Sequence, residues 1–181
     1  MTVLLRTLQG GATLPALGIG TWGMGGDWAH NPANDDDSHV RVLRVALERG
    51  MGHIDTAEMY AAGHAEIIVG RALEGLPRSR AFVTTKLWPL HAERSCVRRA
   101  AEGSLRRMKL STIDLYLVHQ PNYDVPLRET LEAMGQLVDE GLVRHIGLSN
   151  FSLEQIQEAQ AISPKPIAAV QPASVQSTYT L

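Results

Sequence analysis

Four polar side chains in this sequence are of types that together can protonate a carbonyl oxygen. Three of them stand at the ends of apolar, strand-like runs: Asp55, Lys86 and His119. The fourth, Tyr60, lies five residues after Asp55. In a barrel of parallel strands, the carboxyl ends of the strands and the loops that follow them meet on one face and build the active site. We therefore expect the four side chains to share one pocket.

The chemistry of this set is acid catalysis on a carbonyl group. A tyrosine phenol has a pKa of about 10 and donates a proton poorly near neutral pH, unless an adjacent ammonium stabilises the phenolate. Lys86 can supply the ammonium, and Asp55 can hold it charged and oriented. A neutral His119 can donate a hydrogen bond to the substrate oxygen. The set predicts reduction of an aldehyde or ketone by hydride transfer, with Tyr60 as general acid.

Each of these residues also has a plainer interpretation when it is taken alone. Lys86 is consistent with a solvated strand end, His119 with a satisfied core or loop histidine, and Tyr60 with the edge of the core. Asp55 is the exception, because a carboxylate at the end of an apolar strand is costly to bury without a partner.

The elements that must position these residues alternate along the chain. Apolar runs are followed by amphipathic helical stretches, which predicts a parallel sheet with crossover helices. We expect strands at 16–20, 52–56, 82–86, 113–118, 143–148 and 167–171. Helices are expected from near Ser38, with Asp37 as N-cap, to Gly50, and at 65–73, 92–108, 127–140 and 153–161. A small hairpin of 3–5 with 12–15 precedes them.

The spacing of the predicted strands suggests a barrel. Strand starts recur about every thirty residues, the size of one strand–helix unit in a (β/α)8 barrel. We expect residues 1–181 to form a single α/β domain, a TIM-type barrel with about six of its eight units. Alternation and spacing alone suit an open, doubly wound sheet equally well.

A glycine motif after the first predicted strand resembles that of a different fold, the Rossmann dinucleotide-binding fold. Gly18-Ile-Gly-Thr-Trp-Gly23 matches the dinucleotide fingerprint G-x-G-x-x-G. That fingerprint requires a helix to open at the third glycine, whereas Gly25, Gly26 and Pro32 keep this segment irregular. We therefore do not interpret the motif as a Rossmann site.

The composition excludes several other classes. A formal charge of -2 provides no strong field for nucleic acid or an anionic membrane. No long apolar run or basic-then-apolar leader is present, so we expect a cytoplasmic protein. Cys96 is the only cysteine, which leaves no intramolecular disulfide. The run Asp35-Asp36-Asp37 is interpreted as a solvated helix start, and no metal site is predicted.

Five segments resemble the aldo-keto reductase family, and together they cover almost the whole chain. They are Leu17-Gly-Ile-Gly-Thr-Trp22, His53-Ile-Asp-Thr-Ala-Glu-Met-Tyr60, Thr84-Thr-Lys-Leu-Trp88, Asp114-Leu-Tyr-Leu-Val-His-Gln-Pro121 and Gly141-Leu-Val-Arg-His-Ile-Gly-Leu-Ser-Asn-Phe151. The resemblance implies a catalytic tetrad of Tyr60, Lys86, Asp55 and His119. It also implies an NADPH-preferring cofactor site, with NADH left open, and a small-molecule carbonyl substrate.

The resemblance also implies which residues surround the cofactor and the substrate. The residues expected to contact the cofactor are Gly20, Thr21, Trp22, Asp55, Ser149, Asn150 and a glutamine of the sixth strand. That glutamine is either Gln171, which we favour from its distance after Asn150, or Gln176. Trp22 and Trp88 would form walls of the substrate pocket.

The sequence also departs from the family pattern after Leu181. The seventh and eighth strands and the basic segment for the 2'-phosphate do not follow, so we expect a C-terminally truncated domain. Its open sheet edges would favour self-association. Two alternatives to an active reductase are a nicotinamide-binding regulatory or structural protein on the same fold and an inactive, incomplete fragment.

Overall fold

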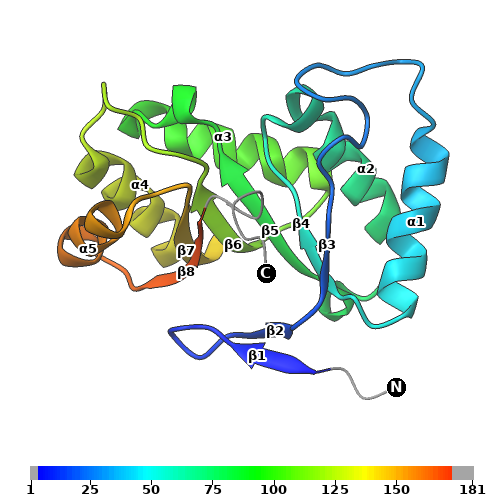
Figure 1. Cartoon of the computed structure of the whole chain (residues 1–181), viewed down its shortest axis with the longest axis horizontal. Coiled ribbons are helices and arrows are strands. Elements are labelled where there is room, and N and C mark those ends of the chain that lie inside the picture. The colour runs from blue at the N-terminus through cyan, green and yellow to red at the C-terminus, as the bar shows by residue number, and fades with distance from the viewer. Residues whose placement is uncertain (1–3, 173–181) are drawn as a thin grey trace, which may run out of the picture.

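The computed structural model describes residues 4–172, which form a curved parallel sheet covered by helices (Figure 1). The sheet has six strands: β3 (Gly18–Gly20), β4 (His53–Asp55), β5 (Phe82–Leu87), β6 (Ile113–Val118), β7 (Val143–Ser149) and β8 (Ile167–Gln171). The connecting helices are α1 (Asp36–Glu48), α2 (His64–Leu73), α3 (Arg94–Met108), α4 (Leu127–Asp139) and α5 (Leu153–Ile162). Short 3-10 turns are η1 (Tyr60–Gly63), η2 (Arg78–Arg80) and η3 (Pro89–His91).

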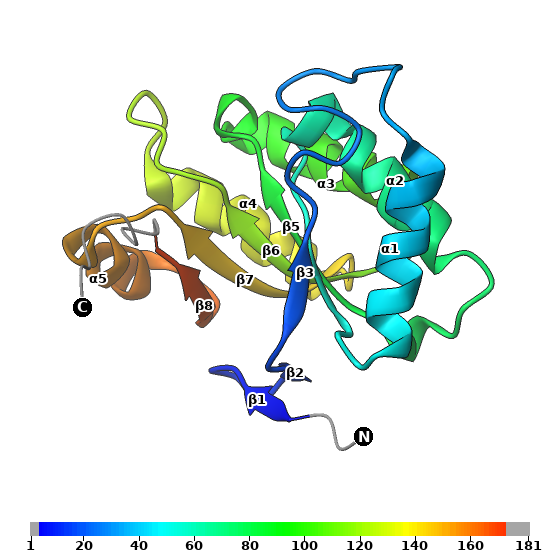
Figure 2. The same ribbon diagram turned by 45° about the vertical axis from the view of Figure 1, so that its right-hand side comes forward.

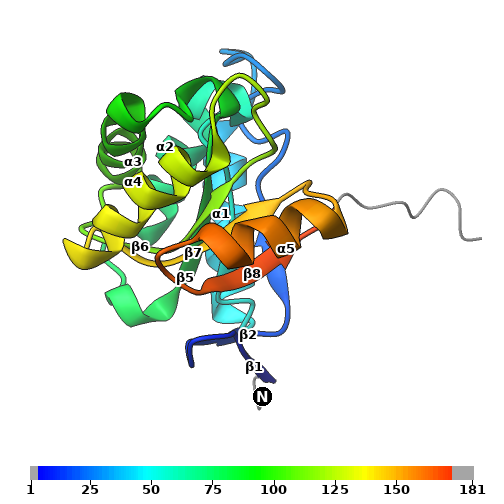
Figure 3. The same cartoon turned by 90° about the vertical axis from the view of Figure 1, so that its left-hand side faces the viewer.

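The strand order decides between the two architectures that spacing alone left open. The six strands pair in the order in which they occur along the chain, and every pair is parallel. A doubly wound sheet instead reverses its strand order at a switch point. Each helix packs against the next, and Figures 2 and 3 show the helices on the outer side of the curved sheet. The predicted incomplete TIM-type barrel is therefore confirmed, with six parallel strands and five connecting helices within residues 4–172.

The core lies mainly between the sheet and its helices. All six residues of β6 are buried, as expected of a parallel strand that is covered on both faces. Leu115 and Leu117 belong to a separate small cluster that includes Leu8, next to the N-terminal hairpin. The large core cluster contains the intervening Tyr116, which is fully buried. Side chains of β6 thus alternate between the two faces of the sheet.

The predicted hairpin forms, but its first strand lies at Leu5–Thr7 rather than at 3–5. β1 (Leu5–Thr7) pairs antiparallel with β2 (Thr13–Pro15). Figures 1 and 2 show this hairpin near the end of the sheet where the strands begin. The predicted site residues at the strands' carboxyl ends therefore lie at the other end of the barrel.

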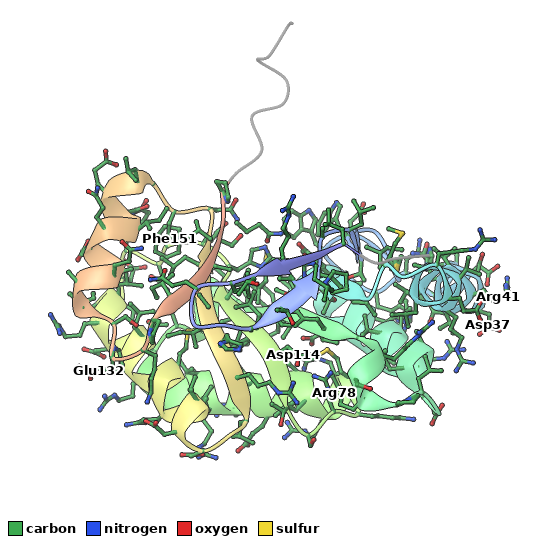
Figure 4. All side chains as sticks on the ribbon, turned by 90° about the horizontal axis from the view of Figure 1, so that it is seen from below. Asp37, Arg41, Arg78, Asp114, Glu132 and Phe151 are labelled. Atoms are coloured by element: carbon green, nitrogen blue, oxygen red, sulfur yellow. The ribbon has the colours of Figure 1, made fainter. Side chains whose placement is uncertain are left out.

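Buried charges hold the amino-terminal end of the sheet together. Asp114 is almost fully buried, accepts a hydrogen bond from Val83 N at 2.8 Å, and pairs with Arg78. Arg144 Nη1 lies 3.0 Å from the other carboxylate oxygen. Figure 4 shows Asp114 and Arg78 near each other in the view from below. A buried carboxylate with this many partners ties β5, β6 and β7 to one another.

Two helix starts differ from those predicted. α1 begins at Asp36, and its N-cap is Asp35, whose side chain accepts from Ser38 N at 2.9 Å, so the prediction of Asp37 as N-cap was wrong. Asp37 instead lies in the first turn, where a carboxylate also favours the helix dipole. α3 begins at Arg94 rather than at residue 92, because its N-cap Glu93 has a ψ angle of 138°, which is not helical.

The glycine motif leads into a loop, as predicted. No helix starts between the end of β3 and Asp36. Gly23, Gly25 and Gly26 all have positive φ angles, of 85°, 81° and 129°. A helix cannot propagate through these conformations, so no helix N-terminus meets a pyrophosphate at this motif.

Two further expectations concern the surface of the chain. None of the helices within residues 4–172 is long and apolar enough to cross a membrane. Strands β3 and β8 each pair on one side only within this part of the chain. Self-association through these edges stays a prediction.

The close crossing of α2 and α3 yields a stability prediction. A Cβ atom at Gly70 would lie 2.8 Å from the carbonyl oxygen of Arg107 and 2.9 Å from the carbonyl carbon of Met108. We expect Gly70→Ala to lower the free energy of unfolding by about 1–3 kcal/mol, because the helices must separate. Denaturant unfolding monitored by circular dichroism measures it.

Gly103→Ala in α3 is the matched control. Its new Cβ would approach only the end of the flexible Arg107 side chain, at 3.1 Å. We expect unchanged or higher stability there, since alanine is the better helix former. Equal effects of the two substitutions would contradict the proposed close crossing.

Candidate active site

Polar residues from five strands lie together at the carboxyl end of the sheet. Strands β4, β7 and β8 end at Asp55, Ser149 and Gln171, Lys86 is the last residue but one of β5, and His119 directly follows β6. Pairing places Gly20 opposite Asp55 and, beyond an irregularity at Ile146 and Gly147, Ser149 opposite Gln171. Register and curvature together direct these strand ends to one mouth.

Lys86 is the central residue of this group. It is 2% exposed, and its ammonium has three oxygen partners, one for each of its protons. Nζ lies 2.5 Å from Asp55 Oδ1, 3.0 Å from the carbonyl oxygen of Thr56 and 3.1 Å from the hydroxyl of Tyr60. Without the Asp55 carboxylate, burial of this charge would be strongly unfavourable.

An unusual turn positions Tyr60. The two residues that follow it, Ala61 and Ala62, have φ angles of 49° and 53°, a left-handed conformation that is costly for residues with a Cβ. Ala61 N donates to the carbonyl oxygen of Asp27 at 2.7 Å, which fixes the turn against the β3–α1 loop. The phenol ring packs edge-on against Trp22, with ring centroids 5.0 Å apart. Its hydroxyl is thereby directed to Lys86.

His119 also packs edge-on against the phenol ring. Its ring centroid is 5.7 Å from that of Tyr60, and the ring is largely buried. Burial, followed by the charge of Lys86, lowers the pKa of His119 to about 4. The imidazole is therefore neutral at physiological pH. Its buried Nδ1 has no hydrogen-bond partner among residues 4–172.

A second group of polar residues lies beside the tetrad. Asn150 has a φ angle of 62°, and its Nδ2 donates to the carbonyl oxygen of His119 at 2.8 Å and to Ser149 Oγ at 3.1 Å. Gln171 Nε2 donates to Asp55 Oδ2 at 3.2 Å. This last contact joins β8 to β4, which are not neighbours in the sheet. The sheet is curved enough to bring them together across the barrel mouth.

The remaining predicted site residues lie at different distances from this centre. Thr21 is buried and donates to the carbonyl oxygen of Asp55 through its backbone nitrogen, at 3.0 Å, and its hydroxyl, at 3.2 Å. Trp22 is half-exposed and packs on Tyr60, whereas the Trp88 ring pairs with His91 at 5.9 Å. Gln176, the alternative to Gln171, lies outside the described residues.

Sequence reasoning missed a network of buried charges behind Lys86. Glu66 is fully buried, and it accepts from Thr85 Oγ1 and from Arg107 Nε, each at 2.6 Å. Burial raises the pKa of the Glu66 carboxyl, and Arg107 opposes that shift. Glu66 shares a helix with buried Ala65, Ile68, Val69 and Ala72. An acidic residue in such an apolar helix was the signal that could have revealed a buried partner.

Glu58 and Trp28 were also missed. Glu58, between Asp55 and Tyr60, accepts from Trp88 N at 3.1 Å and contacts His91 Nδ1 at 3.0 Å. It thus joins the loop after β4 to the loop after β5. Trp28 packs edge-on against Trp22, with centroids 4.9 Å apart, and extends the aromatic surface beside the phenol.

Comparison with known proteins identifies a matching family and close relatives. The sequence model of the Aldo/keto reductase family matches residues 16–179. The chain is 39% identical over 158 residues to aldo-keto reductase YhdN of Bacillus subtilis, covering 82% of this chain and 47% of that protein. It is 42% identical over 150 residues to methylglyoxal reductase YeaE of Escherichia coli, covering 83% and 50%. The chain spans about half the length of the curated relatives it matches.

Solved structures show the same similarity. The thermostable aldo-keto reductase Tm1743, in complex with the inhibitor epalrestat, aligns with a TM-score of 0.91 at 41% identity, over 94% of this chain and 62% of that one. An aldo-keto reductase from Klebsiella pneumoniae in complex with NADPH aligns with a TM-score of 0.79 at 40% identity, over 90% and 55%.

The depressed pKa of His119 yields a titration prediction. By NMR, its ring protons should report a pKa of about 4, and Lys86→Met should raise that pKa because a repelling charge is removed. Between the unfolded-state pKa of about 6.5 and the folded value, only the unfolded chain takes up the proton, so His119 makes the fold less stable as the pH falls through that range.

Lys165→Met, on the protein's periphery, is the control for this titration and should leave the His119 pKa unchanged. Lys165 pairs with Asp139 Oδ1 at 2.5 Å, in a contact separate from the tetrad. A wild-type His119 pKa of 6.5 or higher would show that the imidazole is not held neutral by its surroundings.

Proposed function

The chain belongs to the aldo/keto reductase family, and from this premise we propose that it reduces aldehydes or ketones to alcohols with a reduced nicotinamide cofactor. One observation carries the proposal: a buried ammonium, held by the Asp55 carboxylate, lies 3.1 Å from the hydroxyl of Tyr60. Through this contact the ammonium can stabilise negative charge that develops on the phenol oxygen during proton transfer. A fold that only needed stability would gain little from burying such a charge.

Proton transfer in the proposed reaction starts at Tyr60. The phenol donates its proton to the carbonyl oxygen as that oxygen gains negative charge. The Lys86 ammonium stabilises the phenolate that is left, and it acts in a site with little solvent, where electrostatic interactions are strong. Asp55 holds the Lys86 ammonium in place beside the phenol.

His119 supplies a second donor in this proposal. With a pKa of about 4, its imidazole is neutral, so one ring nitrogen carries a proton and the other does not. A neutral ring can donate a hydrogen bond to the substrate oxygen without competing with Tyr60 as an acid. The two donors would polarise the carbonyl from two sides and stabilise the developing oxyanion.

The residues at the mouth fit a nicotinamide carboxamide. Within residues 4–172, neither Asn150 Oδ1 nor Gln171 Oε1 receives a hydrogen bond, so both can accept from an amide NH₂ group. The Ser149 hydroxyl can donate to the amide oxygen. The reduced nicotinamide supplies a hydride when bound. The K. pneumoniae relative in complex with NADPH supports NADPH as the cofactor.

The surroundings of Tyr60 favour a small carbonyl substrate with an apolar portion. Trp22 packs on the phenol, is 49% exposed, and contacts the more exposed Trp28. We assign Trp22 as a wall of the substrate site. Trp88 is assigned a more distant wall, since its ring pairs with His91. The alternative of a regulatory or structural nicotinamide-binding protein gives no account of the contact between Lys86 and Tyr60.

Turnover and cofactor binding together test the proposal. NADPH is titrated into the pure chain while protein fluorescence is followed, and a panel of aldehydes is then added while cofactor absorbance is recorded. Binding with turnover supports the reductase. Binding without turnover, unchanged by Tyr60→Phe, would support the regulatory alternative, and absence of binding would support an incomplete product.

Tyr60→Phe should lower kcat for carbonyl reduction by about 10²–10⁴-fold, because the general acid is removed while the ring packing is kept. The dissociation constant for NADPH should stay within a few-fold of the wild-type value. Steady-state kinetics and a fluorescence titration measure the two quantities. A variant with normal turnover would refute the assignment of the acid.

Asn150→Gly should weaken NADPH binding by about tenfold while leaving kcat nearly unchanged. Glycine adopts the φ angle of 62° without strain, so the substitution removes the amide and spares the backbone. Loss of one or two hydrogen bonds of about 0.5–1.5 kcal/mol each corresponds to this change in affinity. An unchanged NADPH affinity, with an unchanged melting temperature, would contradict the proposed contact.

A further inference from the structure

Three side chains with metal-binding atoms meet beside the N-terminal end of α2, outside the tetrad. His30 lies in the β3–α1 loop, Asp36 is the first residue of α1, and His64 is the first residue of α2. Each offers one nitrogen or oxygen atom, and these atoms all lie within 4.8 Å of one another. Figure 1 shows the β3–α1 loop arching toward the ends of α1 and α2, where the three segments come together.

The contacts within this group bring the three polar atoms close together. His64 Nε2 lies 2.6 Å from Asp36 Oδ2. The rings of His30 and His64 are stacked, with centroids 3.6 Å apart and planes inclined by 19°. Stacked rings point their lone pairs side by side, so the exposed His30 ring would have to turn out of the stack for its nitrogen to share one ion with His64 Nε2 and Asp36 Oδ2.

A second observation points to a cation at this place. The other carboxylate oxygen of Asp36, Oδ1, is buried and has no hydrogen-bond partner within residues 4–172. Leaving a buried carboxylate oxygen unsatisfied is unfavourable, and such exceptions call for an explanation. A bound cation would compensate this oxygen, either directly or through a water molecule in its coordination shell.

The loop that carries His30 is held in position before any ion binds. Gly25 approaches the His64 ring so closely that a Cβ atom there would lie 2.6 Å from Cδ2, and its φ angle of 81° also favours glycine. Asn31 N donates to the carbonyl oxygen of Gly25 at 2.8 Å, and this turn contains His30. Little conformational entropy would be lost on binding, which favours affinity.

We propose that His30, Asp36 and His64 form a binding site for a divalent transition-metal ion of the Zn²⁺ class. Two imidazole nitrogens and one carboxylate oxygen are a ligand set that suits Zn²⁺, with the fourth position taken by water. Ligand atoms around tetrahedral Zn²⁺ are about 3.4 Å apart, as follows from bonds of about 2.1 Å. The Asp36 and His64 atoms would therefore separate by less than about 1 Å on binding. Mg²⁺ and Ca²⁺ prefer all-oxygen shells and fit this set poorly.

One neighbouring positive charge, on Arg71, would repel a bound cation, but this side chain is also paired with another carboxylate. Arg71 Nη1 lies 3.8 Å from Asp36 Oδ2, while its Nη2 is paired with Asp37. The sequence predicted no metal site here, because the ligands are far apart along the chain and Asp36 lies in an acidic run. Only the folded chain brings the two histidines to that carboxylate.

Calorimetric titration with Zn²⁺ tests the site in the full chain, after removal of any affinity tag. We expect one high-affinity ion per chain and no comparable binding of Mg²⁺ or Ca²⁺. His30→Gln and His64→Gln should each weaken Zn²⁺ binding by at least about tenfold, the loss usual even for residues that only support a ligand. Zn²⁺ should also raise the melting temperature of the wild type more than that of either variant.

Two control variants separate this site from other metal-binding side chains. His145→Gln, in β7, and Cys96→Ser, in α3, should leave the Zn²⁺ affinity unchanged. His30 is exposed, so its replacement tests the ligand without disturbing the core. The proposal is overturned if no one-to-one binding occurs, if His30→Gln binds Zn²⁺ like the wild type, or if Cys96→Ser abolishes binding.

Discussion

The ion pair between Lys86 and Asp55 is the interaction on which the rest of the site depends. An ammonium that is 2% exposed is tolerated only because a carboxylate lies 2.5 Å away and two further oxygens complete its hydrogen bonds. One of those oxygens belongs to Tyr60. The same contacts therefore compensate the buried charge and place the ammonium beside the phenol, as the proposed chemistry requires. The charge of Lys86 also helps to keep His119 neutral.

The architecture of the sheet makes this arrangement possible. Parallel strands in register carry residues of β4, β5 and β6 to the same edge, and curvature brings β8 back toward β4. A flat sheet of the same strands would leave Gln171 far from Asp55. Curvature thus builds one mouth out of residues that are distant along the chain, as is typical of barrel enzymes.

The two ends of the barrel differ in how their buried polar groups are compensated. At the end where strands begin, Asp114 is buried among Arg78, Arg144 and a backbone amide, with partners that satisfy it. At the other end, His119 Nδ1 lacks a partner within the described residues, and Asn150 holds a left-handed conformation. A left-handed asparagine and an unpartnered imidazole nitrogen thus occur where ligands are expected to bind, whereas the Asp114 carboxylate at the opposite end is compensated by its partners.

The sequence by itself determined the alternation of strands and helices and the residue types of the tetrad. Strands Ile113–Val118 and Ile167–Gln171 have the predicted bounds, because apolar runs and their flanking residues act locally. Tertiary structure decided the barrel over the open sheet and the meeting of His30 with His64. These features depend on strand order, curvature and loop paths, which are set by contacts between distant residues and leave no periodic trace in the chain.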